Sequence, residues 1–341
     1  MSERQDIYMK VTVIGSGSWG TALAQVLCDN GVDVVVYGKS EEEINDINKN
    51  HRNSKYFGGV NLHVKLTATT DIQRVKGSDI IVLSVPTIAI ESVCEQLNEI
   101  LDKKTIIVNT SKGFHPETLE RMSCVIRRAL DEKYLSSVVS LIGPSHAEEV
   151  VVRMLTTICA VSICEEDAKK VQETFSNDYL RIYTGTDEIG SEIGVAVKNA
   201  IALASGILHG LGYGDNTRAA LMTRGLMEMT RFGVAMGGRQ ETFMGLTGIG
   251  DLIVTCTSEH SRNFQAGNEI GKAGTAKIFW ETNTKTVEGV RTAKAVHEQA
   301  KKLGIEMPIV DEIYKVLFEN KNAKESAKEL MLRDLKAEIC L

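Results

Sequence analysis

The chain has 341 residues, of which 43% are hydrophobic, and a formal net charge of -6. This length is enough for one large or two ordinary domains with a proper core. A mildly acidic chain with interspersed charges lacks the basic footprint of a nucleic-acid-binding protein, although it is compatible with a small phosphorylated ligand. No run reaches the roughly 18 uninterrupted apolar residues of a membrane span, and the N-terminal MSERQDIYMK leads into a strand pattern rather than a signal peptide. We therefore expect a cytoplasmic protein with no nucleic-acid partner and no membrane span.

The seven cysteines are scattered and odd in number, and none forms a C-x-x-C pair. This argues against a disulfide framework and against a structural zinc site. We interpret them as reduced thiols, most of them in the core: Cys28, Cys94, Cys124, Cys159, Cys164, Cys256 and Cys340. The seven histidines form no H-E-x-x-H pattern, and we predict no metal site.

From residue 10 to about 185, short β-branched runs alternate with amphipathic segments. The strand-like runs are KVTVIG (10–15), VDVVVYG (32–38), SDIIVLSVP (78–86), KTIIVNTS (104–111), VVSLIG (138–143) and TTICAVSI (156–163). Helix-like segments such as IESVCEQLNEIL (90–101) and TLERMSCVIRRAL (118–130) lie between most of them. Continuous apolar strands separated by helices are typical of a parallel sheet covered on both faces. The pattern predicts an α/β, doubly wound fold.

The character of the sequence changes near residue 187. Beyond it the chain has helical patterns almost throughout, as at 192–211, 220–237 and 292–304. We therefore expect an α/β domain over residues 1–188, followed by an all-helical domain over residues 189–341.

The first strand-like run ends in glycines spaced as G-x-G-x-x-G, within KVTVIGSGSWGTALAQVL. Gly15 permits a tight turn, Gly17 lets a pyrophosphate approach the backbone, and Gly20 allows a helix to pack closely on the strand. The strand before the turn and the helix after it favour a Rossmann-like dinucleotide site. The alternative is a plain strand-to-helix turn.

The choice of cofactor depends on the end of the second strand, where an acidic side chain usually binds the ribose 2'-hydroxyl. Here Tyr37, Gly38, Lys39 and Ser40 come before the first acid, Glu41. Lys39 and Ser40 suit a 2'-phosphate, so we predict that NADPH binds no worse than NADH. Lys39 as a solvated loop residue is the alternative.

Two later segments carry polar residues in apolar surroundings. In VAVKNAIALASG (195–206), Lys198 and Asn199 interrupt an apolar helix. A lysine is rarely buried without a partner, so Lys198 either points outward or serves, with a pKa lowered by desolvation, as a proton donor and acceptor. In GLTGIGDLIVTCTSEHSRNF (245–264), a glycine-rich loop presents Asp251 at the start of another helix. Asp251 is either a residue of the site or simply the N-cap of that helix. Arg262 offers a planar fork for a phosphate or is simply a surface arginine.

Two loops follow strands at what we expect to be the same edge of the sheet. They are NTSKGF (109–114) and IGPSHAEEV (142–150). In the second loop, Ser145 and Glu148 have the spacing of a capping box. His146 and Glu149 could form a metal-binding pair on one helix face, but a capped helix with a solvated histidine explains them better.

Together, IGSGSWGTALA, SKGF, GPSHAEE, AVKNAIALASG, GLGYGDNTRAAL, GLTGIGDLIVTCTSEHSRN, VEG and MPIVDEIY resemble the bacterial type of NAD(P)-dependent sn-glycerol-3-phosphate dehydrogenase. The match runs in order from about residue 10 to about residue 330. The resemblance implies the reversible reduction of dihydroxyacetone phosphate to sn-glycerol 3-phosphate for phospholipid biosynthesis, with NADP or NAD as cofactor. It also implies a Rossmann domain, a helical substrate domain and a homodimer.

The resemblance also implies roles for individual residues. Lys198 matches the family's proton donor and acceptor, and Lys112 matches a lysine that contacts both cofactor and substrate. Asp251 matches a substrate position, and we expect it also to take part in catalysis by orienting Lys198. The other substrate positions fall on Gly143, Ser145, Asn199, Ser261, Arg262 and Asn263. The other cofactor positions fall on Gly15, Gly17, Ser18, Trp19, Gly20, Lys39, Ala147, Arg262 and Glu288.

Three segments depart from the family pattern. Ile142 stands where a serine is common, residues 154–157 read MLTT in place of G-[LV]-P-T, and residues 56–66 lack the expected prolines. The rival functions are a dehydrogenase of β-hydroxy acids or sugar acids, and a nucleotide-sensing protein that has lost catalysis.

Overall fold

The computed structural model describes residues 9–283, 287–335 and 337–338, and they form two compact units. The first unit holds the described residues up to Glu192 together with Gly245–Thr247. The second holds Ile193–Met244 and the described residues from Gly248 onward. A functional domain boundary at residue 188 stays a prediction.

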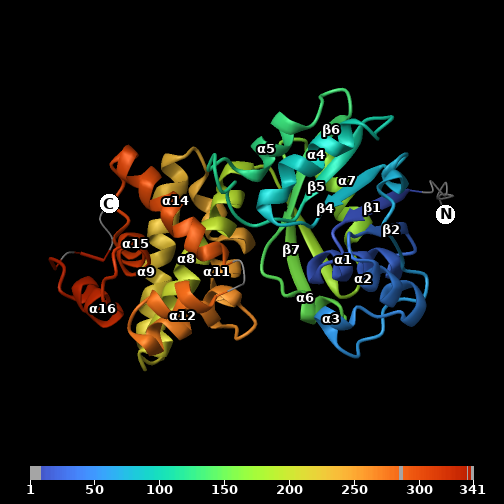
Figure 1. Cartoon of the computed structure of the whole chain (residues 1–341). Coiled ribbons are helices and arrows are strands. Elements are labelled where there is room, and N and C mark those ends of the chain that lie inside the picture. Colours follow the sequence, from blue (N-terminus) through green and yellow to red (C-terminus); the bar gives the residue numbers. More distant parts are fainter. Residues whose placement is uncertain (1–8, 284–286, 336, 339–341) are drawn as a thin grey trace. The chain divides into compact units, whose positions relative to one another are not determined.

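The first unit is built on one eight-stranded sheet with the order β3-β2-β1-β4-β5-β6-β7-β8 (Figure 1). Its strands are β1 (Lys10–Ile14), β2 (Asp33–Tyr37), β3 (Thr67–Thr69), β4 (Ile80–Leu83), β5 (Thr105–Asn109), β6 (Leu135–Ile142), β7 (Thr156–Val161) and β8 (Leu180–Gly185). The order reverses between β1 and β4, and the pairs from β3 to β6 are parallel. The predicted doubly wound α/β sheet is confirmed, with one correction: β7 runs antiparallel to β6.

The helices of the first unit cover both faces of the sheet. They are α1 (Ser18–Asp29), α2 (Glu41–Asn45), α3 (Ser54–Phe57), α4 (Ile90–Asn98), α5 (Met122–Ala129), α6 (Ala147–Val150) and α7 (Glu165–Phe175). Side chains alternate along a strand, so Val11 and Val13 pack with α1 and α7, while Ile14 packs on the other face with α4 and α5. Helix α5 begins at Met122, four residues later than the sequence pattern predicts.

The described part of the second unit is helical, as predicted. Its elements are α8 (Glu188–Gly210), which begins in the first unit, α9 (Asp215–Ala235), α10 (Gln240–Phe243), α11 (Asp251–Thr257), α12 (Arg262–Ala273), α13 (Lys277–Thr282), α14 (Glu288–Leu303), α15 (Pro308–Phe318) and α16 (Ala323–Met331). Helix α8 is long and apolar enough to cross a membrane by length and composition, but 83% of its most apolar window is buried inside the structure. A mostly buried helix of this kind is equally typical of a protein core.

Helices α8 and α12 approach each other through glycines. An added Cβ on Gly206 would lie 2.1 Å from the Phe264 carbonyl oxygen, and one on Gly267 would lie 2.0 Å from the Leu203 carbonyl oxygen. Gly210 and Gly271 are similarly close to the facing helix. Since residues four apart share one helix face, each helix presents a glycine pair to the other, and the two backbones come into direct contact.

The six described cysteines are free thiols. Burial raises the pKa of Cys28, Cys94 and Cys256 to about 12, so these three are protonated at neutral pH. Cys340 lies outside the described residues.

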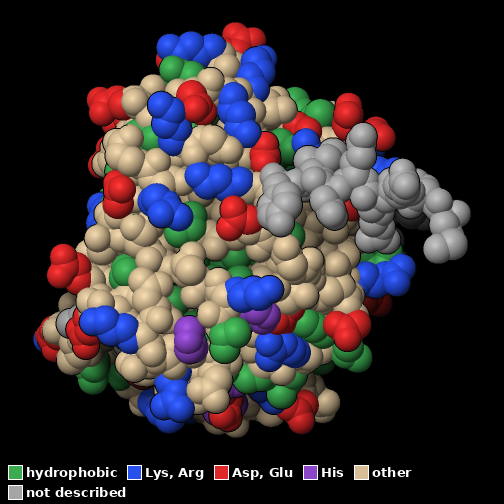
Figure 2. Space-filling view, turned by 90° about the vertical axis from the view of Figure 1, so that its right-hand side faces the viewer, with side chains coloured by type: hydrophobic (Ala, Val, Ile, Leu, Met, Phe, Trp, Pro, Cys, Tyr) green, Lys and Arg blue, Asp and Glu red, His purple; other side chains and the backbone are tan. Residues whose placement is uncertain are grey.

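Figure 2 shows the side of the molecule that lies on the right in Figure 1. On this face Lys and Arg side chains are interspersed with Asp and Glu, and hydrophobic side chains are scattered between them. The view therefore shows mixed charge rather than a single basic stripe.

Candidate active site

The turn between β1 and α1 has the shape needed to hold a dinucleotide. Gly15 has φ +118°, and an added Cβ there would lie 2.2 Å from the Ser84 carbonyl oxygen. A Cβ on Gly20 would lie 2.1 Å from the Gly15 carbonyl oxygen, whereas one on Gly17 would meet nothing within 4 Å. Gly15 and Gly20 thus pack the turn against the sheet, while Gly17 leaves open space beside the start of α1.

Gly17 is the N-cap of α1, and no side chain caps this helix. The first N–H groups of a helix lack partners within the helix and attract anions. The turn therefore fits a pyrophosphate. The adjacent Ser18 and Trp19 are partly buried; the Trp19 ring packs against the core, and its Nε1 is buried with no hydrogen-bond partner among the described residues.

Lys39, predicted to bind cofactor, is exposed and follows β2 with only Gly38 between them. Ser40 caps α2, because its side chain accepts a hydrogen bond of 3.3 Å from the Glu43 backbone N–H. The connection from β2 to α2 presents no acid, as the sequence predicts.

Lys112 and the loop after β6 meet at one backbone carbonyl. Lys112 Nζ donates to the Gly143 carbonyl oxygen at 2.7 Å, and Ser145 Oγ donates to the same oxygen at 3.2 Å. Gly143 has φ +145°, and an added Cβ would lie 3.1 Å from Ile158 Cα. Three predicted substrate positions are thus grouped within the first unit.

The predicted capping box at Ser145 is wrong. The N-cap of α6 is His146, and no side chain caps this helix. The Ser145 hydroxyl instead turns back to Gly143, two residues earlier. Ala147, a predicted cofactor position, is the first residue of α6 and is buried.

Lys198 is buried in the second unit and does not point outward. Its Nζ donates to Asp251 Oδ1 at 2.8 Å and to Thr255 Oγ1 at 2.5 Å. The Lys198 residue is 4% exposed and Asp251 is 0% exposed. A buried charge needs a partner of opposite sign, and Asp251 supplies one to the ammonium group.

Asp251 is not an N-cap. It is the first residue of α11, whose N-cap is Gly250, and it follows a π-helical turn at Leu246–Gly250. This placement directs its carboxylate to Lys198, so the ion-pair interpretation holds and the capping alternative is excluded.

Thr255 was not found by sequence reasoning. Its hydroxyl donates to the Asp251 carbonyl oxygen at 2.6 Å, which leaves oxygen lone pairs for the Lys198 ammonium. The available signal was its spacing, since Thr255 lies four residues after Asp251 on the same helix face.

A second buried group joins α8, α12 and α14. Asn263 Nδ2 donates to Asn199 Oδ1 at 2.9 Å, and the Gly289 backbone N–H donates to Asn263 Oδ1 at 2.8 Å. Both asparagines were predicted to bind substrate, and in the structure each holds a neighbouring helix.

The start of α12 carries Ser261 and Arg262. Ser261 caps the helix by accepting from the Phe264 N–H at 3.2 Å, and Arg262 is exposed. Glu288, a predicted cofactor position, is the first residue of α14. Burial raises the pKa of Glu288, while the charges of Arg291 and Arg262 oppose that shift.

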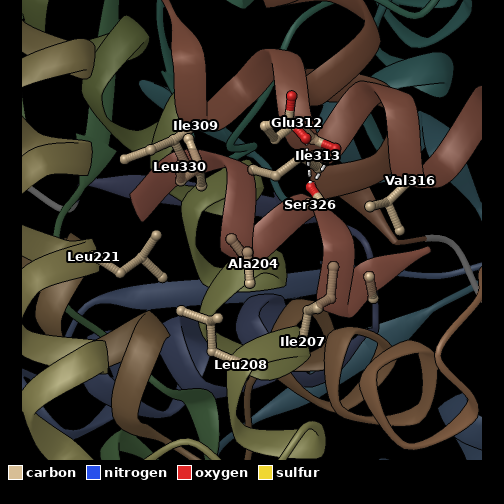
Figure 3. A pocket seen from close by; sticks show the side chains of 12 residues that line it. Ala204, Ile207, Leu208, Leu221, Ile309, Glu312, Ile313, Val316, Ser326 and Leu330 are labelled. Carbon is tan, nitrogen blue, oxygen red and sulfur yellow. Dashed lines mark hydrogen bonds between the residues drawn. The ribbon is translucent and has the colours of Figure 1, made fainter. Parts of the chain in front are cut away.

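A hollow elsewhere in the second unit is not suited to a phosphate. It has a volume of about 40 Å³ and lies among α8, α9, α15 and α16 (Figure 3). Its polar lining residues are Glu312 and Ser326, which bond to each other at 2.7 Å. None of the predicted site residues lines it, and no group of metal-ligating side chains occurs among the described residues.

A glycine turn at the first crossover of a doubly wound sheet, together with a buried lysine–aspartate pair in a helical unit, defines a nicotinamide-dependent oxidoreductase of the Rossmann class. Two family models match the chain. The model of the NAD-dependent glycerol-3-phosphate dehydrogenase N-terminus matches residues 10–168, and that of the C-terminus matches residues 187–328. The chain belongs to the NAD-dependent glycerol-3-phosphate dehydrogenase family.

Relatives of known name match over nearly the whole chain. Glycerol-3-phosphate dehydrogenase [NAD(P)+] of Listeria monocytogenes serotype 4b is 52% identical over 96% of this chain and 98% of its own. The enzyme of that name from Enterococcus faecalis is 50% identical over 96% of this chain and 97% of its own. The crystal structure of glycerol-3-phosphate dehydrogenase from Coxiella burnetii matches with a TM-score of 0.88 and 32% identity over 95% of this chain and 99% of that one.

Proposed function

We propose that the chain catalyses the reversible reduction of dihydroxyacetone phosphate to sn-glycerol 3-phosphate, with NADPH or NADH as the reductant. The buried contact of Lys198 Nζ with Asp251 and Thr255, at 2.8 and 2.5 Å, is the observation that carries this proposal. This contact would hold Lys198 in one position as a proton donor, and the name of the relatives, glycerol-3-phosphate dehydrogenase [NAD(P)+], supports the proposal.

The two parts of the chain take different tasks in this proposal. Residues 1–188 bind the dinucleotide, with Gly15, Gly17 and Gly20 forming the turn for the pyrophosphate. Residues 189–341 bind the substrate and hold Lys198. A dehydrogenase of β-hydroxy acids or sugar acids is less well supported, because relatives that are 50% and 52% identical are named glycerol-3-phosphate dehydrogenase.

When bound, the reduced nicotinamide supplies a hydride to the ketone carbon. Lys198 gives a proton to the carbonyl oxygen as negative charge develops there, and in the reverse direction it takes the proton from the hydroxyl. Asp251 and Thr255 keep Nζ in one position throughout. After the reduction the neutral lysine takes up one proton from solvent, and after the reverse oxidation it releases one, which balances the reaction.

The phosphate of the substrate needs positive or N–H donors. Arg262 at the exposed start of α12 offers a planar fork for a phosphate. The resemblance supports two further groups as substrate positions, each within one unit. In the second unit they are Ser261, Asn263 and Asn199, which are buried, and in the first unit they are Lys112, Gly143 and Ser145, which meet at the Gly143 carbonyl oxygen. Holding the phosphate fixes the carbonyl in one orientation, which lowers the entropic cost of the reaction.

The test is the absorbance of reduced nicotinamide with purified protein and dihydroxyacetone phosphate, with NADH and NADPH in separate cuvettes. We expect both to be oxidised, and NADPH to bind no worse than NADH. Lys198→Ala should lower kcat by about 10³-fold, within the range typical of a lost general acid, and leave cofactor affinity unchanged. Cofactor binding by the wild type without oxidation would instead favour a sensor.

We further propose that the product enters phospholipid synthesis, that the protein is cytoplasmic and that it forms a homodimer. The name of the family and the phosphorylated three-carbon substrate support the first assignment. A dimer predicts a solution mass twice that of one chain, which light scattering measures directly.

A further inference from the structure

The place where a Rossmann-type site usually keeps an acidic side chain is filled in an unusual way. An acid at the end of the second strand normally accepts a hydrogen bond from the ribose 2'-hydroxyl. In this chain Gly38 and Lys39 follow β2. The end of the strand itself therefore offers no carboxylate.

A carboxylate reaches this place from the next helix. Ser16 Oγ, in the glycine turn, donates to Glu43 Oε2 at 2.5 Å. An added Cβ on Gly38 would lie 2.3 Å from the same Ser16 Oγ. The buried Glu43 side chain thus ends one hydrogen bond away from the residue that follows β2.

This orientation of Glu43 is not the one that its local sequence favours. Ser40 and Glu43 have capping-box spacing, and Ser40 does accept from the Glu43 N–H. In a complete box the glutamate would turn back to the N-cap backbone. Here its carboxylate turns to Ser16, so the contact with the glycine turn replaces a local one.

The other oxygen of Glu43 is bound to a lysine that faces solvent. Lys55 Nζ lies 2.6 Å from Glu43 Oε1, and its side chain is 63% exposed. The same Nζ lies 5.3 Å from the centre of the Tyr56 ring. The ammonium group is thus held between a carboxylate and an aromatic face, in a position open to an incoming anion.

We propose that the Glu43–Lys55 pair determines how the chain discriminates between NADPH and NADH. A lone carboxylate at the end of β2 would repel a 2'-phosphate and favour a 2'-hydroxyl. Lys55 cancels that charge and offers a donor to the phosphate, so the pair accepts both cofactors. The inference rests on the proposed dinucleotide site and adds to it the residues that select the cofactor.

Two substitutions should change the selectivity in opposite directions. Lys55→Met keeps the length of the side chain and removes its charge, so the dissociation constant for NADPH should rise about tenfold, the loss typical of one charge-assisted hydrogen bond. The constant for NADH should stay within about twofold, since a hydroxyl needs no cation. Glu43→Gln removes the repelling charge and frees Lys55, so NADPH should bind more tightly relative to NADH.

The measurement is fluorescence titration of the full chain with each cofactor in the absence of substrate. Lys49→Met is the matched control, because Lys49 is an exposed lysine of the turn that follows α2; it should change neither constant. Lys39→Met is the rival, since Lys39 also stands near the end of β2. Thermal unfolding of every variant separates a loss of selectivity from a loss of folding.

Equal changes for both cofactors in Lys55→Met, or no change, would overturn the inference. So would a loss of NADPH affinity confined to Lys39→Met. These results differ from a failure of the proposed function: a wild type that binds both cofactors but oxidises neither would overturn the proposed reaction and still leave the selectivity of Lys55→Met to be measured.

Discussion

Gly17 and Gly20 belong to the same glycine motif, yet Gly17 has open space beside its Cα and Gly20 has none. A Cβ on Gly17 would meet nothing within 4 Å, and its φ of -67° suits any residue. A Cβ on Gly20 would lie 2.1 Å from a backbone oxygen. A methyl group at Gly17 therefore fits the free protein but occupies the space proposed for the pyrophosphate.

We predict that Gly17→Ala leaves stability within about 0.5 kcal/mol of the wild type and weakens NADPH binding by at least about tenfold. Gly20→Ala should instead lower the thermal midpoint, because the backbone cannot give way. The two variants are compared by thermal unfolding and by cofactor titration. Normal cofactor affinity in Gly17→Ala would show that this turn does not hold the pyrophosphate.

Glu228 is a buried carboxyl whose ionisation should make the free energy of unfolding depend on pH. It accepts hydrogen bonds from the Ile309 and Val310 N–H groups, at 2.8 and 3.3 Å, at the start of α15. Burial raises the pKa of Glu228 from 4.5 to about 7; the two backbone hydrogen bonds and the charge of Arg231 oppose the shift, and Asp311 adds to it. The folded state therefore holds this proton over a range in which the unfolded chain has released it.

Because the folded chain binds the proton more tightly, stability falls as pH rises from about 4.5 to about 7. The shift corresponds to about 3 kcal/mol at most. Glu228→Gln keeps one acceptor oxygen for the shorter bond from the Ile309 N–H, loses the acceptor of the longer bond from the Val310 N–H, and cannot ionise. Its free energy of unfolding should therefore lose this slope. Urea unfolding at pH 5 and pH 8 measures this, with Glu241→Gln, an exposed site, as control. An unchanged slope in Glu228→Gln would assign the pH dependence to other groups.

The sequence predicted two residues of the proposed proton-transfer group, Lys198 and Asp251, and missed the third, Thr255. A lysine in an apolar helix requires a partner, and the mechanism that we expect from the sequence uses Asp251 to orient Lys198; the 2.8 Å contact is consistent with that expectation. Thr255 was missed because a threonine in an apolar helix usually only bonds to the carbonyl four residues earlier, which Thr255 also does. The capping box at Ser145 failed because the hydroxyl donates to the nearby Gly143 carbonyl oxygen, whereas a capping box needs it to accept from a backbone N–H of the helix. The spacing of Ser145 and Glu148 does not distinguish these two arrangements.

Helices α8 and α12 depend on each other for the position of the proposed substrate residues. Helix α8 carries Lys198 and Asn199, and the start of α12 carries Arg262 and Asn263. The glycine pairs of the two helices set their separation. Any side chain added at this contact must push α12 away from α8, because the nearest neighbours of the added Cβ are backbone atoms.

We predict that Gly267→Ala lowers the free energy of unfolding by about 2 to 3 kcal/mol, the usual cost of an overpacked contact, and raises the KM for dihydroxyacetone phosphate more than that for NADPH. The asymmetry is expected because the shifted residues belong to the proposed substrate site. Gly214→Ala, where an added Cβ meets nothing within 4 Å, should match the wild type in both respects. If the KM for dihydroxyacetone phosphate stays unchanged in Gly267→Ala, the position of α12 does not affect substrate binding.

Most elements could be predicted because their periodicity is strong. The six predicted strands are present, each with a mostly buried run. The two that were missed are the edge strands: β3 has three residues, and β8 alternates buried and exposed positions over much of its length, with no continuous apolar run. The antiparallel direction of β7 could not be predicted either, because an apolar run has the same pattern in a parallel and in an antiparallel strand. The direction of a strand depends on its connections to its neighbours.

For the whole molecule, the change of sequence pattern predicted two parts of the chain, but not that a later segment belongs to the first part. The change to helices near residue 187 is visible in the sequence. The return of Gly245–Thr247 to the first unit is not. In the structure Thr247 Oγ1 donates to Ser191 Oγ at 3.2 Å, a contact between residues far apart in the chain that no local pattern indicates.

The two tryptophans of the chain provide one reporter for each unit. Trp19 lies in the first turn of α1, next to the glycine turn of the first unit, and Trp280 lies in α13 of the second unit, with its Nε1 donating to the Leu317 carbonyl oxygen at 2.8 Å. Trp280→Phe and Trp19→Phe therefore each leave a single fluorophore that follows the unfolding of one unit. A ligand that binds only the folded protein stabilises it by about 2.7 kcal/mol at a concentration of 100 times its dissociation constant.

We predict that NADPH at that concentration raises the thermal midpoint followed by Trp19 in the Trp280→Phe variant, because the proposed cofactor turn belongs to the first unit. If the units unfold separately, the midpoint followed by Trp280 in the Trp19→Phe variant should stay unchanged; if they unfold together, both midpoints should rise by the same amount. Cofactor titration of both variants checks that each still binds NADPH. A rise seen by Trp280 alone contradicts the prediction, since it would place the stabilising contact in the helical unit and leave the glycine turn without its ligand.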